Sequence, residues 1–325
     1  MLEVVNTMFD RDLSWISFNG RVLAEAQREA TPLLEKIKFL SIYSSNLDEF
    51  YRVRMPVLQA LKKLSKKENN DIQQEDNLLK QATETIHQQQ EQFGTILKSI
   101  VLPQLKSHGI HFIYNEPIPE RLQDELSNYF LSNILAFLQP VEIANSKTNF
   151  FPNNNELYFL VNVETEGKIT SYVLNIPSNE LSRFYETSVD GQKYVLFIDD
   201  IIRQNLSLLF KNKQINGCYS FKITRNAEME LEDEYNVDIA DLIEKQIQKR
   251  DLGLATRFLH EPNIPQTTLM LLVQQLNIGH ANVVEGGRYH NLKDLSSFPI
   301  KDAKWSNQKW PKVVYPTFRK DITLH

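Results

Sequence analysis

The sequence predicts an α+β protein in which an all-helical N-terminal domain is followed by a mixed α+β domain. Three observations lead to this prediction. Apolar residues recur every three or four positions from residue 12 to about residue 105, which is the spacing of amphipathic helices. Beyond that point, apolar runs of strand length interleave with helical segments. These runs follow no strict βαβ rhythm and no glycine-rich phosphate loop is present, which disfavours a doubly wound parallel sheet.

Helix-starting signals and apolar faces predict the extent of the N-terminal domain. The first helix opens at Asp12–Trp15, where an acidic residue precedes the first periodic apolar position. The glutamine-rich segment Asn77–Leu105 is predicted to be a further helix with a solvated polar face. Pro103 and Gly109 mark the end of this region, so the sequence predicts a helical domain at residues 1–107.

One stretch, Ile37–Arg54, interrupts the helical pattern with polar residues. Ser44, Ser45 and Asn46 have short side chains that favour helix caps and turns over helix interiors. The sequence therefore predicts a junction between two helices here, with Asp48 in the first turn of the second helix. Arginines and lysines follow, so this second helix is expected to carry a basic face.

The second region, residues 108–300, contains the predicted strands. Leu157–Thr165 and Ile169–Ile176 are apolar, β-branched runs joined by a glycine-containing turn, which predicts a β-hairpin. Further strands are predicted at Ile110–Tyr114, Tyr194–Phe197, Cys218–Thr224 and Thr256–His260. Helices are predicted at Pro119–Leu138, Asp199–Phe210, Val237–Arg250 and Pro265–Leu276.

Composition excludes several classes of protein and site. The net charge of −5 argues against a general nucleic-acid binder. No run approaches the roughly 18–20 apolar residues of a transmembrane helix, and the N-terminus lacks a signal peptide, so we expect a cytoplasmic protein. The single cysteine, Cys218, rules out an internal disulfide and is expected to be a small buried side chain. His108 and His111 lack companion ligands for zinc.

Three groups of residues, in order along the chain, carry a resemblance to a known family. The first is FDRDLSWISFNGRVL at residues 9–23, followed by SSNLDEFYRVR at residues 44–54. The second is KITRNAE at residues 222–228, and the third is GGRYHN at residues 286–291. Together they resemble the N-terminal and middle domains of the bacterial polyphosphate kinase family.

The resemblance implies reversible transfer of the terminal phosphate of ATP to inorganic polyphosphate, ATP + polyP(n) = ADP + polyP(n+1). It also implies a phosphorylated histidine and Mg²⁺, both located in two C-terminal catalytic domains. Residues 318–325 look like the opening of the first of these domains. We therefore expect part of a longer kinase that is inactive alone, with a nucleotide-contacting domain at 1–107, a dimerisation domain at 108–300 and the start of a catalytic domain at 301–325.

The resemblance places one nucleotide-binding residue in the first domain. Asn46 matches the family's ATP-contacting asparagine, and its amide has both the donors and the acceptor needed to recognise an adenine edge. From its residue type alone, a helix cap is the ordinary role. Arg52 and Arg54 follow as candidates for phosphate oxygens, with an ion-paired or solvated helix face as the alternative for each. No catalytic residue and no metal ligand is expected in this chain.

The two later motifs supply Lys222, Arg225 and Arg288 as further candidates for phosphate binding. Lys222 and Arg225 lie near the end of a predicted strand, where two cations could line the path of a polyanion. The alternative is an ion pair with the acidic run Glu228–Glu234. A glycine pair predicts a tight turn before Arg288, and for His290 we expect a hydrogen-bonding role at a domain junction rather than phosphorylation.

Two classes of function remain at this stage. The first is an ATP-polyphosphate phosphotransferase that binds ATP, ADP and polyphosphate and forms a homodimer in the cytoplasm, with its association with a membrane surface left open. The second is a non-catalytic nucleotide-binding or dimerisation module. The first is favoured because Lys320–His325 stops inside an apparent strand.

Overall fold

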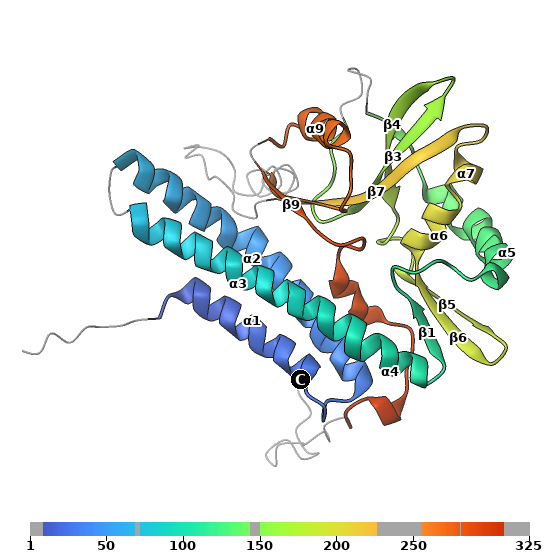
Figure 1. Ribbon diagram of the computed structural model, residues 1–325, viewed down its shortest axis with the longest axis horizontal. Coiled ribbons are helices and arrows are strands. Elements are labelled where there is room, and N and C mark those ends of the chain that lie inside the picture. The colour runs from blue at the N-terminus through green and yellow to red at the C-terminus, as the bar shows by residue number, and fades with distance from the viewer. Residues whose placement is uncertain (1–8, 69–71, 144–149, 226–254, 280, 309–325) are drawn as a thin grey trace, which may run out of the picture.

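The computed structural model describes residues 9–68, 72–143, 150–225, 255–279 and 281–308, with the backbone alone for 63–68 and 72–76. A bundle of long helices is followed by a mixed α/β region that contains two sheets (Figure 1). The predicted fold class is therefore confirmed, whereas the domain limits at residues 107 and 300 stay a prediction. None of the helices in these residues is long and apolar enough to cross a bilayer.

The N-terminal region has three long helices that lie side by side: α1 (Arg11–Gln27), α2 (Leu33–Glu68) and α3 (Ile72–Ile96). Helix α3 continues directly into the π-helical turn η1 (Leu97–Val101) and α4 (Leu102–Ser107). The cap of α1 is Asp10, whose carboxylate accepts backbone N–H bonds of 2.9 Å from Asp12 and Leu13. These bonds satisfy two of the amide groups that a helix start leaves without an intrahelical partner.

Helix α2 runs without interruption through the residues that were predicted to form a junction. Ser44, Ser45 and Asn46 lie in its middle, so the prediction of two separate helices is wrong, and Asp48 does not lie in a first turn. The physical reason is the apolar face of α2, which is buried on both sides of the polar residues, at Leu40 and Phe50 for example. Burial of a long apolar face outweighs the weak helix preference of a few polar residues.

The larger sheet has the strand order β2-β4-β3-β7-β8-β9. It contains the predicted hairpin of β3 (Leu157–Thr165) and β4 (Lys168–Ile176), which turns at Glu166 and Gly167 with φ values of 51° and 78°. Strand β7 pairs antiparallel with β3 and β8, and β9 pairs parallel with β8. The remaining strands are β2 (Val141–Glu142), β7 (Gln214–Arg225), β8 (Ala255–His260) and β9 (Asn282–Glu285).

The smaller sheet has the strand order β1-β6-β5. Its strands are β1 (Ile110–Ile113), β5 (Phe184–Val189) and β6 (Gln192–Phe197). The helical elements of this region are α5 (Glu120–Tyr129), η2 (Phe130–Ile134), η3 (Leu135–Phe137), α6 (Ile198–Gln204), α7 (Leu206–Leu209), α9 (Gln266–Gln275), η4 (Leu292–Ser297) and η5 (Ala303–Trp305). Helices α5 and α6 share one hydrophobic core with strands of both sheets.

The predicted elements agree with these strands and helices apart from three kinds of difference. Strands β2, β5 and β9 were not predicted, because they are short or alternate between half-buried and exposed positions with many polar residues. The predicted helix Asp199–Phe210 is divided into α6 and α7 at Asn205, and the predicted helix Pro119–Leu138 is α-helical only to Tyr129 and continues as η2 and η3. The predicted helix Val237–Arg250 lies outside the described residues.

The thiol of Cys218, on β7, is half-buried, and burial raises its pKa to about 12.

An aromatic cluster joins the smaller sheet to the segment that follows β9. Phe112 lies 5.4 Å from Phe197 and 5.2 Å from Phe298, measured between ring centroids, and Tyr289 stacks on Phe197 at 4.4 Å. Residues of α1 to α4, β1, β5 and β6 share one hydrophobic core with this segment. The segment after β9 therefore begins at the larger sheet and ends against the helices (Figure 1).

We expect Phe112→Ala to lower the free energy of unfolding by about 3 to 5 kcal/mol, because a buried ring is replaced by a cavity among other rings. Phe137→Ala, at a position 40% exposed, should change it by less than about 0.5 kcal/mol. Urea denaturation of both variants gives the comparison. Equal losses would contradict the role of the cluster.

Candidate functional site

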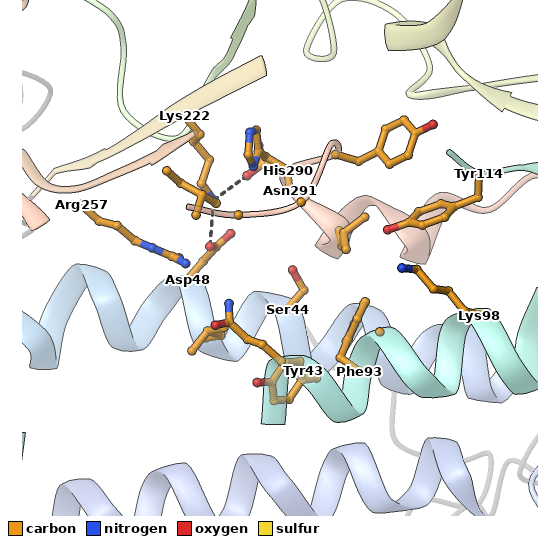
Figure 2. A pocket seen from close by; sticks show the side chains of 18 residues that line it. Tyr43, Ser44, Asp48, Phe93, Lys98, Tyr114, Lys222, Arg257, His290 and Asn291 are labelled. Carbon is orange, nitrogen blue, oxygen red and sulfur yellow. Dashed lines mark hydrogen bonds and ion pairs between the residues drawn. The ribbon is translucent and has the colours of Figure 1, made fainter. Parts of the chain in front are cut away.

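A cavity of about 260 Å³ lies where the helices meet the larger sheet (Figure 2). Helices α2 and α3 and the turn η1 form one wall, and β7, β8 and residues 286–292 form the other. The side chains that line it include Tyr43, Ser44, Leu47, Asp48, Phe93, Lys98, Tyr114, Lys222, Arg257, Leu259, Tyr289, His290 and Asn291. The cavity therefore joins residues from distant parts of the sequence.

Lys222 connects the two walls of the cavity. Its side chain is 1% exposed, and its Nζ donates to Asp48 Oδ1 at 2.8 Å and to Asn291 Oδ1 at 2.7 Å. Burial lowers the pKa of Lys222, and the Asp48 carboxylate opposes that shift. The Glu228–Glu234 run offered as the alternative partner lies outside the described residues. The acid that pairs with Lys222 is instead Asp48, on α2.

Arg257, on β8, is a cavity residue that sequence analysis missed. It is 2% exposed, and its guanidinium carbon lies 3.9 Å from the centroid of the Tyr51 ring. Among the described residues, its Nε and Nη2 have no hydrogen-bond partner. The available signal was an arginine inside the predicted strand Thr256–His260, since a charged residue in a buried strand needs a partner.

His290 lines the cavity from the segment after β9 and is 2% exposed. Its Nε2 lies 3.1 Å from Ser220 Oγ, and its backbone oxygen accepts a 3.3 Å bond from Arg183 Nη2. Burial lowers the pKa of the imidazole to about 3, so the ring is neutral at pH 7. These contacts fit the hydrogen-bonding role at a junction expected from the sequence.

Arg288 does not line the cavity. Its Nη2 and Nε donate to Asp200 Oδ1 at 2.8 and 3.2 Å, and the neighbouring Tyr289 hydroxyl donates to Asp200 Oδ2 at 2.6 Å. The glycine pair before it forms no tight turn, since the Gly286 N–H donates to His260 O at 2.8 Å and extends the pairing of β9. A Cβ at Gly286 would lie 2.7 Å from Leu259 Cδ1, so the close approach of the two strands explains this glycine.

Arg225 is also outside the cavity, at the end of β7. It is 3% exposed, its Nη2 donates to Pro152 O at 3.0 Å, and its guanidinium carbon lies 3.8 Å from the centroid of the Phe151 ring. Of the three candidates in the two later motifs, the structure thus brings only Lys222 into the cavity.

Asn46 lies on a different face of α2 from the cavity-lining residues. It is half-buried, and its Nδ2 donates to Asn19 Oδ1 at 3.1 Å, while Asn19 Nδ2 donates to Tyr43 O at 3.2 Å. A second pocket of about 370 Å³ follows this face toward the C-terminal end of α2 and is lined by Arg11, Asp12, Trp15, Glu49, Phe50, Val53 and Arg54.

The two arginines that follow Asn46 are both ion-paired. Arg54 donates to the Asp12 carboxylate from Nε at 2.6 Å and from Nη2 at 3.0 Å. Arg52 makes two bonds of 3.0 Å to Glu49, one turn earlier on α2. In the part of the chain that the structure describes, no group of three or more His, Cys, Asp or Glu could hold a metal ion.

Comparison with known proteins identifies the family. Residues 8–113 match the polyphosphate kinase N-terminal domain, and residues 121–298 match the polyphosphate kinase middle domain. The chain belongs to the polyphosphate kinase family. It is 30% identical over 321 residues to the polyphosphate kinases of Yersinia pestis and Escherichia coli K12, which covers 96% of this chain and 46% of each relative.

A crystal structure supports the assignment to the polyphosphate kinase family. The polyphosphate kinase of Porphyromonas gingivalis superposes with a TM-score of 0.75 at 29% identity, covering 94% of this chain and 43% of that protein. The polyphosphate kinase of Vibrio vulnificus YJ016 is 30% identical over 300 residues, which is 42% of its length. The chain thus spans less than half the length of these relatives.

The buried, neutral His290 predicts a pH dependence of stability. In the unfolded chain its imidazole takes up a proton below its ordinary pKa of 6.5, whereas the folded protein resists this down to about pH 3. The unfolded state therefore binds more protons between these values, and the contribution of His290 to stability falls as the pH falls.

We expect the free energy of unfolding of the wild type, relative to that of His290→Gln, to decline between pH 6.5 and pH 4. The limiting slope is about 1.4 kcal/mol per pH unit. Urea denaturation at pH 7, 6, 5 and 4 measures the difference. A difference that stays constant with pH would show that His290 is not held neutral.

Proposed function

We propose that this chain supplies the N-terminal and middle domains of an enzyme that transfers the terminal phosphate of ATP reversibly to inorganic polyphosphate. The match of two successive polyphosphate kinase domains, in the family order, carries this proposal. The cavity supports it, because Lys222 and Arg257 place buried positive charge where a polyanionic substrate could be held.

Phosphoryl transfer depends mainly on positioning the reacting groups and on neutralising their charge. In this proposal the phosphorylated histidine and the Mg²⁺ site lie outside the chain, and no residue of the chain is catalytic. The described residues bind and orient substrates. The proposed complete protein is a cytoplasmic homodimer, and light scattering that gives the mass of one subunit would exclude the dimer.

Asn46 is proposed to contact ATP. Its hydrogen bond to Asn19 uses one amide hydrogen, and within the described residues the amide oxygen and the second hydrogen are available to a base. The neighbouring pocket offers the half-buried Trp15 ring for an adenine, and Arg54, which is paired with Asp12, lines the same pocket. Aromatic and cationic groups beside an amide suit a nucleotide.

The remaining arginine candidates have structural partners that account for their positions. Arg52 is held by Glu49, Arg225 by the Pro152 carbonyl and Arg288 by Asp200. To bind phosphate, each would have to give up these bonds. Arg54 is likewise held, by the Asp12 carboxylate at 2.6 and 3.0 Å, so the proposed nucleotide contact is Asn46.

We expect Asn46→Ala in the complete protein to raise the KM for ATP by about threefold to tenfold, because one hydrogen bond is worth about 0.5–1.5 kcal/mol. Ser45→Ala, exposed on the same helix, is the matched control and should leave KM unchanged. ATP-dependent formation of polyphosphate is the measurement, with melting temperature as the check on folding. An unchanged KM would remove the assignment of Asn46, and a wild type that forms no polyphosphate would overturn the proposed function.

A further inference from the structure

The cavity between α2 and β8 contains an unusual number of unpaired polar atoms. Among the described residues, five buried atoms of its lining have no hydrogen-bond partner: Tyr43 Oη, Asp48 Oδ2, Arg257 Nε, Arg257 Nη2 and His290 Nδ1. Buried polar atoms in folded proteins are nearly always paired, so a concentration of unpaired ones around one cavity needs a physical explanation. The explanation must begin with Arg257, which carries the charge.

The guanidinium of Arg257 is held in a geometry suited to an oxyanion. Tyr51 covers one face of the group, which leaves the in-plane N–H bonds of Nε and Nη2 to point along its edge. This edge is the side of an arginine that binds two oxygens of a phosphate or carboxylate at once. Figure 2 shows the guanidinium directed along α2 toward Asp48 and the Lys222 ammonium.

The charge balance of the lining selects an anion. The carboxylate of Asp48 is paired with Lys222 at 2.8 Å, and His290 is a neutral imidazole. The lining therefore has one carboxylate, Asp48, for the three cations Lys98, Lys222 and Arg257, so its net charge is positive. An unpaired buried charge is costly, and an anion seated beside Arg257 would offset that cost.

The shape of the surroundings favours a linear anion over a compact one. The cavity reaches the surface at Lys98, which is exposed. Lys98 and Tyr114 also border a neighbouring groove of about 420 Å³, which is further lined by Lys106 and His111. The groove is also lined by Glu116, so its two lysines, Lys98 and Lys106, outnumber its one acid. A ligand bound at Arg257 can therefore continue past Lys98 into this groove, as a chain of phosphates would.

We propose that this cavity binds a phosphoryl group of a linear polyphosphate, with Arg257 as its main ligand and Lys98 at its mouth. The choice of phosphoryl chemistry rests on the proposed function. The site is separate from the nucleotide contact, because the α2 residues that line it, Ser44 and Asp48 among them, stand on a different face of the helix from Asn46. The same chemistry could come from the phosphate tail of ATP, and the test separates the two sources.

The test titrates the full 325-residue chain with tripolyphosphate by isothermal calorimetry at low salt. We expect Arg257→Gln to weaken binding about tenfold or more, because charge-assisted bonds to a buried group are lost, and Lys98→Gln to weaken it severalfold. Lys80→Gln is the matched control, since Lys80 is exposed on α3 and does not line the cavity. If Arg257→Gln does not fold, the tripolyphosphate affinities of Arg257→Lys and Lys98→Gln test the proposal instead.

Two results would overturn the proposal: no binding of tripolyphosphate by the wild type, or binding that neither Arg257 nor Lys98 affects. A parallel titration with ATP distinguishes polyphosphate from the phosphate tail of ATP as the ligand of this site. If ATP binding depends on Arg257 while tripolyphosphate binding does not, the site holds a nucleotide tail and the polyphosphate assignment is wrong. Asn46→Ala should leave tripolyphosphate binding unchanged. A complete protein that forms no polyphosphate, with Arg257-dependent binding intact, would overturn the proposed function and not this site.

Discussion

The ammonium of Lys222 is the contact on which the arrangement of the two regions depends. It comes from the larger sheet and bonds at once to Asp48 on α2 and to Asn291 in the segment after β9. Asn291 in turn donates to Asn155 O at 2.8 Å, so the network continues into the sheet. A buried ammonium needs such partners, because moving a charged group from water into the protein interior costs several kcal/mol. The bonds of Lys222 therefore fix α2 and the segment after β9 relative to β7. These three elements contribute to the walls of the cavity.

Helix α2 makes different contacts on two of its faces. One face of α2 carries Asp48 toward the sheet, and the other carries Asn46 toward α1 and the pocket beside Trp15. An uninterrupted helix fixes the distance between these faces, because its residues share one rigid backbone. In the proposed enzyme, the nucleotide contact and the polymer site would thus lie beside different faces of one helix, which suits a transfer that depends on relative position.

Local patterns predicted much of this fold, and contacts between distant residues account for what they missed. The hairpin of β3 and β4 and the buried strand β8 follow from runs of apolar residues, and the family motifs led to Asn46 and Lys222. The continuous course of α2 was missed because capping preferences are local, whereas the burial that overrides them is not. Likewise the Lys222–Asp48 pair joins residues 174 positions apart, and Arg257 faces a cavity that exists only after folding.

The most direct test of this account is a double-mutant cycle on the pair that joins the two regions, with Lys222→Met, Asp48→Leu and the double variant measured by urea denaturation. Each single substitution leaves the other charge buried and should cost about 3 kcal/mol. The double variant removes both charges, so its cost should fall short of the sum by about 2 kcal/mol. Costs that simply add would contradict the claim that this ion pair holds the helices against the sheet.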